Sequence, residues 1–145
     1  GHGNAAFRYF TESSPAAMND KAEIRVMEPY VHGQFTESSA SPYAGRAHVH
    51  WLTGTASTVM VGCVEGILGI RPDFRGLTLA PSIPSTWKKL TIEKEFRGKQ
   101  LHISVENPDE KESGCCSLVL NGQKLADNYI PEKLLQDKNE VKLTL

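Results

Sequence analysis

The sequence has little of what marks several protein classes. Its 145 residues include only three cysteines, two of them adjacent (Cys115 and Cys116), so a disulfide framework is a poor interpretation and we expect reduced thiols in a cytoplasmic protein. The formal net charge is −1 without a basic stripe, so we expect no nucleic-acid partner. No apolar run approaches the roughly 18 residues that span a bilayer, so we expect no membrane partner either.

The residue pattern changes near Pro72. Before it the apolar residues have helical or irregular spacing, which predicts a helix end at Ala5–Phe10 and an aperiodic stretch over residues 16–50. The strongest helical pattern covers Thr55–Leu68, in which Glu65 is the only charged residue. A helix that is apolar nearly all round is usually buried, so we expect this one to be covered on most faces.

The residues after Pro72 alternate with the period of strands. Leu90–Phe96 and Leu101–Val105 form one such pair around an Arg97-Gly98 turn, and Asn121-Gly122 predicts a type I′ hairpin. With Leu77–Leu79 and a last strand at Val141–Leu145, the pattern predicts about six to eight antiparallel strands in a small β-sandwich. The fold class is therefore α+β.

The start of the Thr55–Leu68 helix combines groups that suit an anion. Thr53-Gly54-Thr55 offers unpaired backbone N–H groups, two hydroxyls and the positive end of the helix dipole. Glycine also lets a ligand approach the main chain closely. The alternative is that Thr53 or Thr55 is an ordinary N-cap, which is the commoner role of such a threonine.

Polar residues precede this helix start. Gln34 carries an amide that can both donate and accept hydrogen bonds, and Glu28, held extended by the following proline, can contact a ligand or support the site. A surface glutamine and a purely architectural corner are the alternatives. The pair His48 and His50 lacks a third ligand at suitable spacing, so we expect no metal site.

These motifs carry a resemblance to a known family. The run from Glu28 to Gly69, with HGQFTE and GRAHVHWLTGTASTVMVGCVEGILGIRPD, resembles the C-terminal part of the inverting cellobiose, cellodextrin and chitobiose phosphorylases, and looks most like a cellodextrin phosphorylase. Family members are several times longer, so the chain is expected to be a C-terminal piece. The resemblance implies that residues 1–72 complete an (α/α)6 catalytic barrel and that residues 73–145 form a jelly-roll-like β-sandwich domain.

The resemblance also implies a reaction. The full enzyme would reversibly phosphorolyse β-glucosidic bonds of cellodextrin or cellobiose to α-glucose 1-phosphate with inversion, using no metal or organic cofactor. Thr53 and Gly54 would bind phosphate, while Gln34 and Glu28 would face the sugar. Its partners would be inorganic phosphate and a β-glucan oligosaccharide, and many members are homodimers.

The family's general acid lies upstream of this chain, so no catalytic residue is assigned and the isolated chain is expected to be inactive. Two rival functions stay open. One is a phosphorylase of the same family that acts on another linkage, such as β-1,2-glucan. The other is a noncatalytic carbohydrate-binding or structural module built on the β half.

Overall fold

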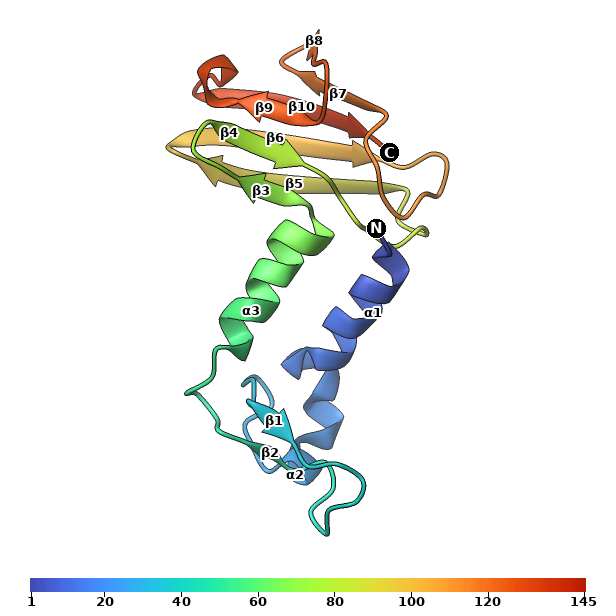
Figure 1. The fold of residues 1–145 in the computed structure, drawn as a ribbon, viewed down its shortest axis with the longest axis vertical. Helices are drawn as coiled ribbons and strands as arrows, with labels where there is room; N and C mark the ends of the chain where they lie inside the picture. Colours follow the sequence, from blue (N-terminus) through green and yellow to red (C-terminus); the bar gives the residue numbers. More distant parts are fainter. The chain divides into compact units, whose positions relative to one another are not determined.

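The computed structural model describes all 145 residues, which form two compact units. The hairpin unit comprises Arg8–Gly62, and the β unit comprises Gly1–Phe7 with Cys63–Leu145. Helices come first in the chain and most strands later (Figure 1), which confirms the predicted α+β class. The barrel, the jelly roll and the domain boundary at residue 72 stay predictions. None of the helices combines the length and the apolar character that crossing a bilayer requires.

The first part of the chain has more regular structure than its pattern indicated. Its elements are α1 (Gly3–Ser13), the 3₁₀ helix η1 (Pro15–Lys21), α2 (Ala22–Arg25), and the paired strands β1 (Phe35–Thr36) and β2 (Ala47–His48). The predicted helix end before Pro15 is confirmed. The expectation of an aperiodic stretch over residues 16–50 was only partly right, because elements this short cannot display a hydrophobic period.

The predicted Thr55–Leu68 helix consists of two segments. The α-helix α3 (Thr55–Val61) continues as the π-helix η2 (Gly62–Ile67), in which the Leu68 N–H donates to the Cys63 carbonyl at 2.8 Å. The expectation of burial on most faces was wrong, since Met60 is 64% exposed and Val61 53%.

The β unit contains two sheets and a short 3₁₀ helix. The five-stranded sheet has the order β5 (Lys89–Phe96), β6 (Lys99–Glu106), β10 (Lys138–Thr144), β7 (Ser117–Leu120) and β8 (Gln123–Lys124). The three-stranded sheet has the order β3 (Ile70–Pro72), β4 (Gly76–Leu79) and β9 (Tyr129–Pro131), and η3 (Glu132–Leu134) follows β9. These eight strands agree with the predicted number.

Both predicted tight turns are present. Arg97 and Gly98, between β5 and β6, have φ angles of 50° and 75°, and Asn121 and Gly122, between β7 and β8, have 49° and 83°. A positive φ at both central residues is the requirement of a type I′ turn. The local sequence therefore specified both hairpins.

The pairing of the last strand differs from the prediction. β10 lies between β6 and β7, and it runs antiparallel to β7 but parallel to β6. The five-stranded sheet is therefore mixed rather than antiparallel. Alternate residues of these strands are buried, so one face of the sheet forms the core, with fully buried side chains at Leu101, Ile103, Val105, Leu118, Val141 and Leu143.

We expect the central strand to dominate the stability of the β unit. Leu143→Ala removes a side chain that is 1% exposed, and the lost burial plus the cavity should lower the free energy of unfolding by about 2–5 kcal/mol. Urea denaturation measures this change. The matched control is Lys142→Ala, the exposed neighbour on the other face, which should shift stability by no more than about 0.5 kcal/mol. Equal effects of the two substitutions would contradict the assigned core face.

Candidate functional site

The polar residues ahead of α3 are held by a short hairpin on a small core. Met27, Val31 and Ala47 are the buried apolar residues of this core. β1 pairs with β2 in antiparallel register, and the Gln34 N–H donates to the His48 carbonyl at 2.9 Å. The backbone of Gln34 is thereby fixed, while its side chain stays exposed and available to a ligand.

A cavity of about 350 Å³ lies within the hairpin unit and brings two parts of the predicted site together. Gln34 and Thr55 both line it, as do Lys21, Arg25 and His32. Glu12 is the one carboxylate of the lining. Thr53, Gly54 and Glu28 do not belong to the lining. The volume lies within the range of small-ligand sites, and the wall carries more cationic than anionic side chains.

Arg25 is a cavity residue that the sequence did not reveal. Its Nη2 donates to the Val31 carbonyl at 3.3 Å and contacts the Met27 sulfur at 3.1 Å, whereas its Nη1 is buried without a hydrogen-bond partner. The guanidinium is therefore a fixed positive charge in the cavity wall. It ends a four-residue helix that shows no period, so no local pattern could have indicated its role.

The hydroxyls around Gly54 organise the start of α3. Thr53 Oγ1 accepts from the Thr55 N–H at 3.1 Å and donates to Thr55 Oγ1 at 2.8 Å. Ser57 and Thr58 hydroxyls both donate to the Gly54 carbonyl, each at 2.9 Å. The N-cap position is Gly54, which has no side-chain cap, while Thr53 Oγ1 satisfies the N–H of the first helical residue, Thr55.

Gly54 has no internal reason to be glycine. Its φ of −71° is accessible to any residue, and a Cβ placed there would meet no atom within 4 Å. Open space beside a main-chain N–H group is compatible with an approaching ligand.

Glu28 contacts an aromatic residue far along the chain. Its Oε1 accepts from Trp51 Nε1 at 3.2 Å, and its Oε2 lies 3.9 Å from His50 Nδ1. A hydrogen bond from its own backbone N–H and the one from Trp51 lower the pKa of Glu28. Trp51 also meets the Tyr30 ring edge to face, with the ring centroids 6.1 Å apart. Glu28 thus orients an exposed indole rather than lining the cavity.

The backbone that carries Trp51 is strained. Val49 has a φ of 56° and Trp51 a φ of 65°, a region that β-branched and bulky residues rarely occupy. The Leu52 N–H donates to the His50 carbonyl at 2.7 Å, which closes a three-residue γ-turn around Trp51. Strained backbone of this kind is concentrated at functional sites.

The two histidines of the motif have separate surroundings. His48 stacks on the Phe35 ring at a centroid distance of 4.8 Å, and its Nε2 lies 3.0 Å from Glu37 Oε1 without the angle of a hydrogen bond. His50 Nε2 lies 3.3 Å from the Ala47 carbonyl. No group of three or more histidine, cysteine, aspartate or glutamate side chains in the chain could hold a metal ion.

Comparison with known proteins finds a family similarity for this segment. Residues 1–69 match the description "Glycosyl hydrolase 94 superfamily, catalytic domain". This segment is therefore similar to the glycosyl hydrolase 94 superfamily. The match contains the whole cavity lining and the start of α3, so every residue of the candidate site lies in sequence typical of this catalytic domain.

Individual relatives extend the similarity to the second half. An N,N'-diacetylchitobiose phosphorylase of Vibrio proteolyticus is 35% identical over 145 residues, which is 100% of this chain and 18% of that protein. Another, of Vibrio furnissii, is 37% identical over 123 residues, which is 85% of this chain and 15% of that protein. A cellobionic acid phosphorylase of Neurospora crassa is 33% identical over 96 residues, which is 66% of this chain and 11% of that protein. The chain spans less than a fifth of the length of these curated relatives.

The contact between Glu28 and Trp51 predicts a pH-dependent fluorescence signal. In a Trp87→Phe background Trp51 is the only tryptophan, and protonation of Glu28 should change its emission as the pH falls. Because the folded pKa of Glu28 is lowered, the midpoint should lie below its ordinary value of 4.5, with the contact intact at higher pH. Glu28→Gln should remove the transition. A midpoint at or above 4.5, or a transition that persists in Glu28→Gln, would show that another group is responsible.

Proposed function

We propose that the chain is part of a glycoside phosphorylase that cleaves a β-glycosidic bond with inorganic phosphate and inverts the anomeric configuration. The observation that carries this proposal is the cavity in the matched catalytic-domain sequence, which gathers Gln34, Thr55 and a cationic wall beside a helix start. A phosphorolytic site needs both a sugar-binding amide and a place for a phosphate dianion. These residues supply both kinds of group.

Phosphate binds in this proposal at Thr53 and Gly54. Thr53 offers its hydroxyl and Gly54 its N–H, next to the positive end of α3. The open space at Gly54 supports a close approach to the main chain. The next residue, Thr55, lines the cavity together with Lys21 and Arg25, whose positive charges favour a dianion. Fixed donors of this kind position the nucleophile without reorganisation during the reaction.

The sugar is bound by Gln34, with Glu28 as a positioning residue. The exposed amide of Gln34 faces the cavity and can pair with hydroxyl groups. Glu28 holds Trp51, which is 66% exposed, and the flat indole next to the phosphate segment can cover one face of a pyranose ring. This assignment keeps Glu28 in the site but moves its contact from the sugar to the indole.

The chemistry is one displacement at the anomeric carbon. An oxygen of phosphate forms the new C–O bond while the bond to the leaving sugar oxygen breaks and that oxygen takes a proton from a carboxylic acid. We assign that acid to the part of the family enzyme that lies upstream, so the chain alone should be inactive. Neither a metal nor an organic cofactor enters this scheme.

The sequence motifs and the relatives point to different substrates. The motifs favour cellodextrin or cellobiose, whereas two of the relatives act on N,N'-diacetylchitobiose by name. A β-1,2-glucan substrate is the further alternative. With this function we also propose a cytoplasmic homodimer, in which residues 1–72 complete an (α/α)6 barrel and residues 73–145 form a β-sandwich.

The reaction class is tested on the full-length protein that contains this sequence. Incubated with phosphate and either cellobiose, cellotriose or N,N'-diacetylchitobiose, it should release the sugar 1-phosphate from one of them, and no product should form without phosphate. An enzymatic or NMR assay of the sugar 1-phosphate measures this. Sugar release that is independent of phosphate would indicate a hydrolase, and sugar binding by residues 73–145 alone without turnover would favour a noncatalytic module.

The phosphate role of Thr53 is tested in the same enzyme. Thr53→Ala should lower kcat/KM for phosphate roughly 5- to 150-fold. This corresponds to a loss of about 1–3 kcal/mol of transition-state stabilisation, the scale of a hydrogen bond to a charged group. Thr53→Ser keeps the hydroxyl and is the matched control, which should retain most of the activity. If both variants lose activity equally, or if phosphate kinetics stay unchanged in Thr53→Ala, the hydroxyl does not bind phosphate.

A further inference from the structure

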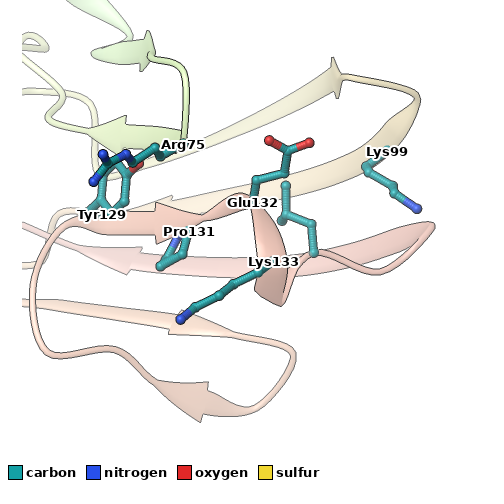
Figure 2. A pocket seen from close by; sticks show the side chains of 7 residues that line it. Arg75, Lys99, Tyr129, Pro131, Glu132 and Lys133 are labelled. Atoms are coloured by element: carbon teal, nitrogen blue, oxygen red, sulfur yellow. The ribbon is translucent and has the colours of Figure 1, made fainter.

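The β unit contains a second cavity that the proposed phosphorolysis does not use. It has a volume of about 740 Å³ and lies where η3 and the ends of β4 and β9 meet the β5–β6 hairpin. Figure 2 shows its side chains, with Arg75 and Tyr129 towards one end and Lys99 at the other. The lining residues are Arg75, Lys99, Tyr129, Pro131, Glu132, Lys133 and Leu135.

The rim of this cavity is held by one carboxylate. Asp73 Oδ1 accepts from the N–H groups of Arg75 at 2.7 Å and Gly76 at 2.8 Å, and from the Tyr129 hydroxyl at 2.9 Å. The first of these bonds contributes most to the lowered pKa of Asp73. The turn between β3 and β4 is therefore fixed to β9, and the Tyr129 ring has a defined position.

A second set of bonds joins the same turn to the β5–β6 hairpin and to η3. Arg97, at the β5–β6 turn, donates to the Phe74 carbonyl at 3.2 Å and the Asp73 carbonyl at 3.3 Å, and it forms an ion pair with Glu132. Three segments distant in sequence are thereby joined. A rim joined in this way is preformed, so a ligand would not have to order it on binding.

The charges that remain unpaired in the cavity are positive. Glu132 is paired with Arg97, and Lys99 Nζ lies 2.8 Å from Asp137 Oδ1. Arg75 and Lys133 form no ion pair, although the nearby Asp73 carboxylate acts on Arg75 through space. A planar guanidinium can hold a phosphate or carboxylate through two parallel hydrogen bonds. An anionic group is therefore the best match for this part of the lining.

The rest of the lining suits the body of a sugar. The Tyr129 ring, Pro131 and Leu135 provide apolar surface, and the volume exceeds that of a single anion. Pyranose rings present an apolar C–H face and a polar rim, which fits a tyrosine ring bordered by hydrogen-bond donors.

We propose that this cavity binds a small saccharide that carries one anionic group, with Arg75 and Lys133 holding the anion and Tyr129 covering the sugar ring. The site lies wholly in the β unit and does not depend on the phosphorolysis proposed above. The anion is either a phosphate, as in a sugar 1-phosphate, or a carboxylate, as in a uronic acid. Both ligands share the same chemistry, a pyranose ring that carries one anionic substituent.

The test uses the 145-residue chain labelled with ¹⁵N and four probes: glucose 1-phosphate, glucuronate, glucose and inorganic phosphate. At least one of the two charged sugars should shift the amide signals of Arg75, Tyr129 and Lys133. Glucose and phosphate alone should bind at least about tenfold more weakly, a difference of about 1.4 kcal/mol. The comparison of glucose 1-phosphate with glucuronate identifies which anion the site prefers.

Variants separate this site from general attraction to surface cations. Arg75→Gln combined with Lys133→Gln should weaken binding of the charged sugar at least about tenfold, while Lys124→Gln with Lys138→Gln, two exposed lysines of the five-stranded sheet outside the cavity, should change it less than twofold. Spectra without ligand confirm that each variant is folded. Equal losses in both pairs, an unchanged affinity in the first pair, or glucose binding as tightly as the charged sugars would each overturn the proposal.

Discussion

The β unit depends on the insertion of its last strand into the middle of the five-stranded sheet. β10 hydrogen-bonds to β6 on one side and to β7 on the other. One edge of each of these two strands therefore lacks its backbone hydrogen bonds until the C-terminal residues are in place. The buried Asn139 fixes where this strand enters. Its amide nitrogen donates to the carbonyls of Gln100 and Gln136, at 3.0 and 2.8 Å, and its oxygen accepts from Asn121 at 3.1 Å. A hydrophobic side chain there would leave several buried polar groups unpaired, which costs more than the added apolar burial returns.

This constraint also explains which features the sequence could predict. The turns at Arg97-Gly98 and Asn121-Gly122 follow from local rules, since few residue pairs tolerate two positive φ angles in succession. The parallel pairing of β6 with β10 joins residues more than 30 positions apart. The alternation of apolar and polar residues in a strand predicts which face is buried, but it does not predict which strand lies beside it. The π-helical turn after Val61 was missed because it has nearly the same apolar pattern as an α-helix.

The candidate site divides in the same way. Thr53 and Gly54 could be selected because a helix start has recognisable chemistry in the sequence itself, whereas Gln34 was selected through the family resemblance, since an amide alone does not distinguish it from a surface glutamine. The contact between Glu28 and Trp51 could not, because 23 residues separate them and a strained γ-turn sets the direction of the indole. Arg25 was missed for a related reason: its anchors, the Val31 carbonyl and the Met27 sulfur, follow a left-handed residue, Val26, that ends α2. Tertiary context decides each of these positions.

The energetics of the hairpin unit indicate that its own core is too small for the conformation that it holds. Val49 and Trp51 occupy left-handed backbone at a cost of the order of 1–3 kcal/mol each. Against this, the buried apolar set is Met27, Val31 and Ala47, and complete burial of a Met or Val side chain contributes about 1.5–3 kcal/mol. Leu52, next to the strained turn, is 85% exposed, and Met60, on α3, is 64% exposed, so apolar surface of this unit stays uncovered. In our proposal the remainder of the glycosyl hydrolase 94 catalytic domain covers this surface, so that packing against it holds the Trp51 turn and the start of α3 in the geometry that phosphate and sugar require.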